Sequence, residues 1–169
     1  MQALAPRPSW NRARLGFERS LLPAPCHAGA DALWRAWRAM PRGPSGLPTR
    51  RDLDPAALRP LLPFLALVEP TPRGWQFRLT GTAFYERYRF EPTRRSMRDL
   101  LTAEAAAEAE SCCNEAVAGA GPVSYLARVL GGGRDHVVHE GLCLPIESPK
   151  GDACWILGGI FFFDDPLRH

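Results

Sequence analysis

The stretch WQFRLTGTAFYERY, residues 75–88, contains two hydrophobic patterns with only a short glycine-threonine junction between them. In its first half, apolar and polar residues alternate, which predicts a half-buried strand. In its second half, aromatic residues recur at helical spacing, which predicts a short helix. The apolar residues that form the two patterns are Trp75, Phe77, Leu79, Phe84, Tyr85 and Tyr88.

The junction indicates how a strand and a helix can follow each other so closely. Gly81 allows a backbone turn that a residue with a side chain would resist. Thr82 has a side chain suited to capping the first turn of a helix. We therefore expect the chain to turn sharply here and to fold the aromatic helix back against the strand.

The rest of the chain predicts the elements around this turn. Thr102 is a suitable cap for a long alanine-rich helix at 103–119, and a shorter helical segment is predicted near 96–101. Because the helices are grouped together in sequence and not interleaved with strands, we expect an α+β fold. It comprises a five-stranded antiparallel sheet with helices on one face. The predicted strands are residues 64–69, 75–80, 122–130, 136–147 and 153–163.

We divide the chain into three parts. Residues 1–30 contain four prolines and no sustained periodicity, which predicts a flexible extension. Residues 31–59 are a flanking helix, for which Asp31 is a suitable cap, followed by a linker. Residues 60–164 form the domain that contains the sheet.

The predicted flanking helix, residues 31–40, has an apolar face that is too large to be left in water. The last strand carries apolar residues on both sides, so the sheet face away from the other helices also needs a cover. We expect the flanking helix to provide it. The residues of its apolar face are Leu33, Trp34, Trp37 and Met40.

Composition limits the classes of function. The chain has 21 Lys and Arg against 18 Asp and Glu, and the first 30 residues account for the whole positive excess. A nucleic-acid surface is therefore not indicated. Five cysteines, two of them adjacent, make a poor disulfide framework and fit a reducing cytoplasm. No apolar run is long enough to span a membrane.

Motifs for metal binding and catalysis are weak. His136 and His139 are three residues apart on a predicted strand, which places the two rings on opposite faces. Neither a nucleophile elbow nor a phosphate-binding loop occurs, so we do not expect an enzyme. Cys112 and Cys113, inside the long helix, are either a redox pair or two small packing residues.

A group of arginines follows the aromatic helix, and two interpretations of it stay open. Acidic residues are interspersed among these arginines, which is typical of a mixed solvated face. The alternative is a surface for an anionic partner. The arginines are Arg87, Arg89, Arg94, Arg95 and Arg98.

The order of elements and several short motifs resemble the PAS family of sensory domains, over roughly residues 60–164. The resemblance is strongest to compact, single-domain bacterial PAS proteins. Where many such proteins have Thr-Gly-Arg before the long helix, this chain has Thr93-Arg94-Arg95. The matching motifs are Leu62-Pro63, Arg78-Leu79-Thr80-Gly81-Thr82, Leu144-Pro145 and Gly158-Gly159.

The resemblance implies a ligand pocket between the sheet and the helices. In it Arg78 and Arg128 are candidates to meet an anionic group, although strand arginines are more often solvated. The alternative is a filled core without a ligand. A haem or metal site from His139, Cys143 and Cys154 is not indicated, since neither a CxxC nor an HxxxH motif occurs. Flavin photochemistry is not indicated either, since it would need a cysteine on the helix after the second strand, and no cysteine lies between Cys26 and Cys112. The candidate pocket residues are Phe77, Leu79, Phe84, Tyr85, Tyr88 and Trp155.

The resemblance also implies a role in signalling. We expect a cytoplasmic sensory or regulatory domain that binds a small molecule or a partner protein. Only six residues follow Phe163, so we expect output through contact with another protein. We further expect the flanking helix to pair with its copy in a homodimer. The alternatives are a structural interaction module without a ligand and, less favoured, a nucleic-acid-associated regulator.

Overall fold

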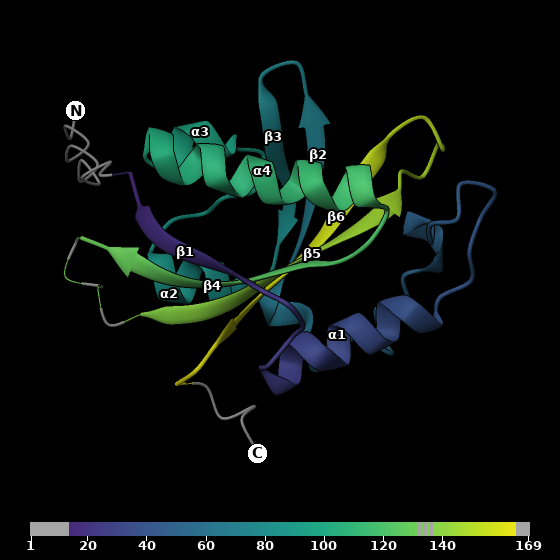
Figure 1. Ribbon diagram of the computed structural model, residues 1–169, viewed down its shortest axis with the longest axis horizontal. Coiled ribbons are helices and arrows are strands. Elements are labelled where there is room, and N and C mark those ends of the chain that lie inside the picture. The colour runs from purple at the N-terminus through teal and green to yellow at the C-terminus, as the bar shows by residue number, and fades with distance from the viewer. Residues whose placement is uncertain (1–13, 132, 134, 136, 165–169) are drawn as a thin grey trace, which may run out of the picture.

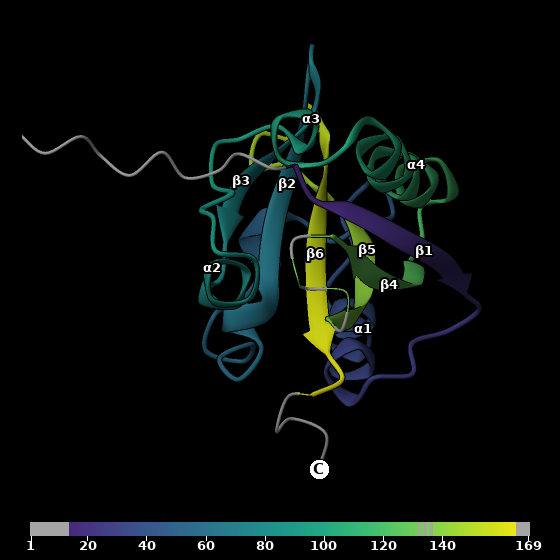
Figure 2. The same ribbon diagram turned by 90° about the vertical axis from the view of Figure 1, so that its left-hand side faces the viewer.

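The computed structural model describes residues 14–131, 133, 135 and 137–164. These residues form one six-stranded sheet in which every pair of neighbouring strands is antiparallel. The strands lie side by side in the order β1-β4-β5-β6-β2-β3 (Figure 2). The expected α+β class with an antiparallel sheet is confirmed. The strands are β1 Gly16–Leu22, β2 Leu65–Thr71, β3 Gly74–Thr80, β4 Val123–Leu130, β5 Val138–Glu147 and β6 Cys154–Phe162.

Helices lie on both sides of the sheet (Figure 1). The long helix α4 and the short α3 lie above the sheet in this view, whereas α1 lies below it. α4 contacts β1, β4, β5, β6 and β3, and α1 contacts β5 and β6 from the other side. The helices are α1 Ala28–Ala39, α2 Thr82–Tyr88, α3 Met97–Leu100 and α4 Ala103–Gly119, with short 3₁₀ helices η1 Arg50–Asp52 and η2 Leu62–Phe64.

β1 corrects the prediction that residues 1–30 are a flexible extension. It pairs with β4 along its whole length, so the sheet has six strands and not five. The sequence did not reveal this strand because its alternation is short and because Arg19 occupies an inward position that usually holds an apolar residue. Residues 1–13, also assigned to the extension, lie outside the described residues.

α1 begins earlier than predicted, at Ala28, because buried polar groups hold the backbone before it. Nδ1 of His27 accepts a hydrogen bond from the N–H of Gly29 at 2.9 Å and so caps the first turn. The backbone N–H groups of Cys26 and His27 donate to the buried carboxylate of Glu140 at 3.1 and 2.6 Å. Since Glu140 belongs to β5, the sheet itself positions the start of α1.

The turn between β3 and α2 is as abrupt as predicted, but its cause is different. Gly81 is the N-cap residue, and Thr82 is the first residue of the helix. The backbone of Gly81 has φ −75° and ψ 167°, which any residue can adopt. A side chain at this position would instead collide with the backbone carbonyls of Leu62 and Pro63. Glycine therefore allows η2 to lie directly against the turn.

α4 begins as predicted, since the hydroxyl of Thr102 accepts a hydrogen bond from the N–H of Ala105 at 3.3 Å. Its buried face consists of small side chains, which lets the helix lie close to the sheet. Within the described ranges, no helix is both long and apolar enough to cross a membrane. The buried residues of α4 are Ala105, Ala106, Ala109, Cys112, Cys113 and Ala116.

Candidate functional site

A β-bulge in the edge hairpin decides which side chains of β3 face the helices. Val68 pairs with Phe77, and Leu67 pairs with Leu79, so one strand has an extra residue between these pairs. An extra residue reverses the alternation of side chains between the two faces. Phe77 therefore packs against Phe84 of α2, with ring centroids 6.2 Å apart, whereas Leu79 lies on the opposite face.

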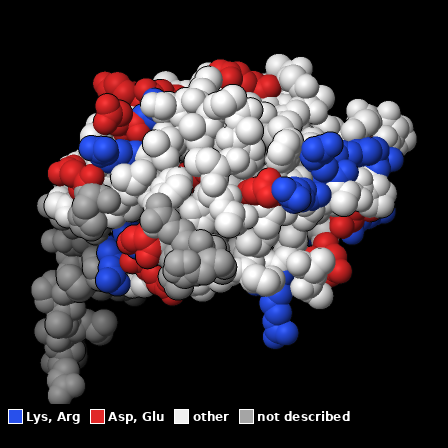
Figure 3. Space-filling model, turned by 60° about the horizontal axis from the view of Figure 1, so that its bottom comes forward, with Lys and Arg blue, Asp and Glu red and all other residues white. Residues whose placement is uncertain are grey.

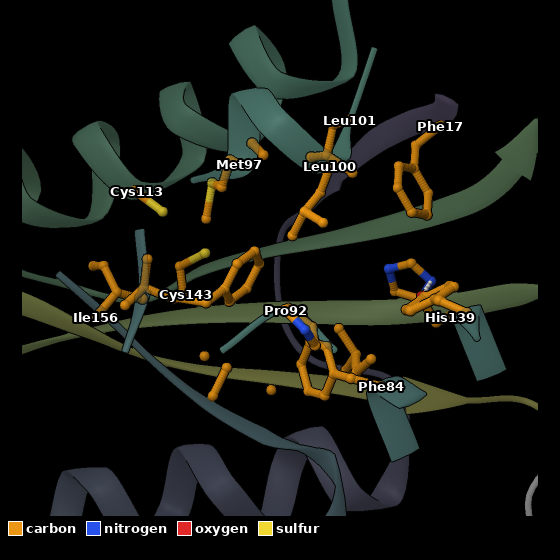
Figure 4. A pocket seen from close by; sticks show the side chains of 18 of the residues that line it. Phe17, Phe84, Pro92, Met97, Leu100, Leu101, Cys113, His139, Cys143 and Ile156 are labelled. Carbon is orange, nitrogen blue, oxygen red and sulfur yellow. Dashed lines mark hydrogen bonds between the residues drawn. The ribbon is translucent and has the colours of Figure 1, made fainter. Parts of the chain in front are cut away.

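The inner face of the sheet and helices α2, α3 and α4 surround a cavity of about 90 Å³ (Figure 4). This is several times the roughly 10–15 Å³ that one water molecule needs. The lining is mostly apolar, and Arg19 is its one charged side chain among the described residues. Other lining side chains include Phe17, Phe77, Phe84, Tyr88, Met97, Leu100, Cys113, Tyr125, His139, Cys143 and Ile156.

Arg19 of β1 brings a buried guanidinium to the cavity lining. Its side chain is only 7% exposed and stacks on the Tyr125 ring, with Cζ 4.6 Å from the ring centroid. One Nη atom donates to the carbonyl of Ala105 at 3.4 Å and lies 3.6 Å from the carboxylate of Glu108. The buried Nε–H has no hydrogen-bond acceptor among the described residues. An unpaired buried donor of this kind is unusual in native proteins and calls for an explanation.

Gly141 makes room for the aromatic ring beneath Arg19. Tyr125 of β4 faces Gly141 of β5 across the strand pair. A Cβ atom at Gly141 would overlap the Tyr125 ring. The missing side chain therefore lets the ring lie over β5, where Arg19 stacks on it.

His139 of β5 is the second polar group at this end of the cavity, close to Phe17 (Figure 4). His139 pairs with Ala127 of β4, and Ala127 pairs with Arg19 of β1. His139 and Arg19 therefore lie in the same row across the sheet. The Oη atom of Tyr88 lies 2.9 Å from Nδ1 of His139, at hydrogen-bond distance.

Burial decides the charge states of both partners in this pair. Burial, and to a lesser extent the positive charge of Arg19, lowers the pKa of His139 to about 3, so its ring is neutral near pH 7. Burial also raises the pKa of Tyr88 well above its ordinary value, so its hydroxyl stays protonated. Of the described residues in this part of the lining, Arg19 is therefore the sole source of charge.

Cys113 and Cys143 lie at the other end of the cavity (Figure 4). Hydrogen bonding to Cys143 and burial raise the pKa of the Cys113 thiol well above its ordinary value. Burial raises the pKa of Cys112 to about 11. Protonated thiols are poor nucleophiles, so these cysteines suit packing better than a redox switch.

A comparison with known protein families agrees with this architecture. Residues 26–161 match the PAS domain family. The chain belongs to the PAS domain family. No curated protein matches the sequence at a significant level. The match includes α1 and the strands after β1, except for the last residue of β6, while β1 lies before it.

Of the predicted pocket residues of this PAS domain, Phe77, Phe84 and Tyr88 line the cavity. Leu79 does not, because the bulge turns it to the other face, where it is 54% exposed. Tyr85 does not either, because it is 50% exposed on α2. The prediction of these two residues from simple periodicity is therefore corrected.

Trp155 also lies outside the cavity. Its neighbour Ile156 lines the cavity, and successive residues of a strand point to opposite faces. The indole instead stacks with Arg78, whose Cζ is 4.9 Å from the ring centroid. Sequence reasoning found the correct strand here but chose the wrong face.

Arg78 and Arg128 do not meet at a common site. Arg78 belongs to the edge strand β3, and Arg128 to β4, with three strands between them. Arg78 pairs with the carboxylate of Glu69 at 3.2 Å, and Arg128 is exposed. Neither lines the cavity. Among the cavity residues that the sequence did not predict, Phe17 and Arg19 lie on the unpredicted strand β1, whereas others, such as Met97, Tyr125 and His139, lie on predicted elements.

The apolar face of α1 is largely buried against its own sheet. Leu33 is fully buried, and Trp37 is 5% exposed. The indole N–H of Trp37 donates to the carbonyl of Pro145 at 2.9 Å. Trp34 and Met40 are partly buried and pack against the same core. α1 thus provides the cover that the second sheet face was expected to need, and the homodimer stays a prediction.

Charges on the surface are mixed. Figure 3 shows one face on which acidic and basic groups are interspersed around a large uncharged area. Within the predicted arginine group, Arg98 binds Glu110 at 2.8 and 3.0 Å, and Arg87 binds Asp164 at 2.7 Å. The described residues contain no group of His, Cys, Asp and Glu arranged to hold a metal ion. His136 lies outside the described residues.

Proposed function

We propose that this PAS domain is a sensory or regulatory module that binds a small molecule in the cavity between the sheet and α2, α3 and α4. The cavity is the observation that carries the proposal. It holds more than one water volume, and apolar side chains line most of it. A binding event there would act on helices and on the sheet at once, because both contribute to the lining.

Two variants of α4 test this proposal. Ala109 lines the cavity, whereas Ala107 is exposed on the same helix. Ala109→Leu fills part of the cavity with a larger side chain, and Ala107→Leu is the matched control. Native mass spectrometry should show a bound small molecule on the wild type and on Ala107→Leu, but less of it on Ala109→Leu. Xenon enters apolar cavities. It should perturb the NMR signals of the lining residues in the wild type and in Ala107→Leu, and perturb them less in Ala109→Leu.

The competing function is an interaction module without a ligand. It is favoured by the modest size of the cavity, since typical ligand pockets measure roughly 300–1,000 Å³. A protein that carries no small molecule, and whose lining signals xenon does not perturb, would establish this alternative. It would also remove the proposal of a sensor at this cavity.

We also propose that the domain acts in the cytoplasm, is not an enzyme, and passes its signal to a regulatory protein by contact. The described cysteines are free thiols, which suits a reducing compartment. A homodimer is part of this proposal. Its interface at α1 would use the outer sides of Trp34 and Met40, because Leu33 and Trp37 are covered within the chain. Light scattering at tens of micromolar protein tests it, and a monomer under these conditions would refute it.

A further inference from the structure

The unpaired Nε–H of Arg19 indicates which chemical group a cavity ligand presents. Arg19 lines the cavity, its side chain is more than nine-tenths buried, and this donor has no acceptor among the described residues. Buried donors are normally paired, because losing water without gaining a partner is costly. A ligand with a hydrogen-bond acceptor at this end of the cavity would remove that cost.

The charge of Arg19 favours an anionic acceptor over a neutral one. Its ion-pair partner among the described residues, Glu108, is half exposed and lies 3.6 Å from the Nη side of the guanidinium. Among the described residues, the remaining cavity lining has no anionic side chain, and His139 is neutral. Charge-assisted hydrogen bonds are stronger than neutral ones, and more so away from water.

The size of the cavity and its single charge limit the anion further. At about 90 Å³ the cavity is smaller than the roughly 150 Å³ cavity that accommodates benzene, so a ligand has about six non-hydrogen atoms or fewer. One guanidinium donor beside aromatic side chains suits a monoanion better than a doubly charged phosphate. The rest of the ligand lies among apolar residues such as Phe84, Met97 and Ile156.

From these observations we infer that the cavity binds a short-chain monocarboxylate, whose carboxylate accepts a hydrogen bond from the Nε–H of Arg19. The inference rests on the proposed function, because it assigns the chemical class of the ligand at the same cavity. It gives β1 a specific role, which is to supply the anion-binding group to a site that, apart from Phe17, is built by the rest of the domain.

Two probes of equal size separate the contribution of charge from that of shape. Sodium butyrate and butyramide have the same number of non-hydrogen atoms, but only butyrate is anionic near pH 7. Calorimetric titration should show butyrate binding to the wild type at least about tenfold more tightly than butyramide. Arg19→Met should bind both probes with similar affinity.

Arg128→Met is the matched control, since it removes one exposed arginine from the neighbouring strand β4 without touching the cavity. It should keep the preference for butyrate. If Arg19→Met does not fold, the arginine Nε–H signals of the isotopically labelled wild type give a second measurement. One buried Nε–H signal should shift and become protected from solvent exchange with butyrate, and not with butyramide.

The outcomes are distinct. Equal affinity of the wild type for the two probes, or a preference for butyrate that survives in Arg19→Met, would overturn the carboxylate assignment while leaving a ligand-binding cavity. Failure of both probes and of xenon to reach the lining residues would overturn the proposed function, and the assignment with it.

Discussion

Gly158 and Gly159 of β6 are adjacent glycines for which the structure predicts opposite effects of the same substitution. A Cβ atom at Gly158 would point into the cavity, and its nearest neighbours would be the carbonyl oxygen and Cβ of Ala66 at 3.7 and 3.8 Å. These are ordinary contacts. A Cβ atom at Gly159 would point to the α1 face and lie 2.6 Å from the Phe161 ring and 2.9 Å from Leu33.

The magnitudes follow from these contacts. Gly158→Ala adds a methyl group where there is room and restricts the unfolded chain, so we expect a gain in stability of about 0.5–1 kcal/mol. Gly159→Ala forces the buried Phe161 or α1 to move, and overpacking of this kind costs about 1–3 kcal/mol. For a chain of this length, each kcal/mol corresponds to a shift in Tm of about 2–4 °C.

Urea unfolding and thermal unfolding of the two variants beside the wild type would measure these effects. Gly158→Ala should unfold at or above the wild-type midpoint, and Gly159→Ala clearly below it. Gly158→Ala should also weaken the binding of any cavity ligand, because the new methyl group takes up part of the cavity. Similar destabilisation by both substitutions would refute the assignment of the two glycines to opposite faces. A harmless Gly159→Ala would refute the tight packing of α1 on β6.

Three further predictions concern other parts of the fold. The folded-state pKa of His139, about 3, lies below its ordinary value of 6.5, so the unfolded chain takes up the proton first as the pH falls. The contribution of His139 to stability is therefore complete above about pH 6.5 and falls by about 1.4 kcal/mol per pH unit below it, towards pH 3. His139→Gln should remove this part of the pH dependence of urea unfolding, and an unchanged slope would contradict the burial of a neutral ring. Trp37→Ala should lower the free energy of unfolding by about 3–5 kcal/mol, because it opens a cavity and leaves the Pro145 carbonyl without its donor. Urea denaturation measures this loss, and light scattering measures the oligomeric state. A variant that is monomeric but as stable as the wild type would show that α1 matters only for dimerisation. Deletion of residues 1–22 removes β1 and should lower Tm and abolish any preference for butyrate, whereas deletion of residues 1–13 retains β1 and should have the smaller effect.

Much of the fold could be predicted from periodicity alone. The strands after β1 and the long helix α4 have clear apolar patterns and turn residues at their ends, and Thr102 caps α4 as expected. The start of α1 could not be predicted, because it depends on Glu140, more than 100 residues later in the chain. The prediction that position 81 needs glycine was correct, but for a different reason. The requirement comes from close contact with η2 and not from an unusual backbone angle.

The candidate site could be predicted less well, and each error has a physical cause. A single bulge reversed the face of Leu79, although the same strand placed Phe77 correctly. Bulges have no reliable signal in one sequence, because they arise from the pairing of two strands. The alternation of the last strand predicted Trp155 as a cavity residue, whereas in β6 it is the neighbouring Ile156 that lines the cavity.

The missed prediction of β1 differs from the other errors. Arg19 interrupts the apolar alternation that would have indicated a strand, and the same residue gives the cavity its charge. An apolar residue in place of Arg19 would have completed the alternation and made the strand easy to predict. It would also have left the cavity without any charged group, since the other described lining residues are uncharged. A buried arginine on an edge strand lowers the stability of the fold when its hydrogen bonds are incomplete, because burying the charge costs free energy. Departures from local rules concentrate where function requires them. The same reasoning predicts that Arg19→Met raises the free energy of unfolding in the absence of ligand, or leaves it unchanged, while removing the selectivity of the site. A strongly destabilised Arg19→Met would instead show that Arg19 serves the fold through Tyr125 and Glu108.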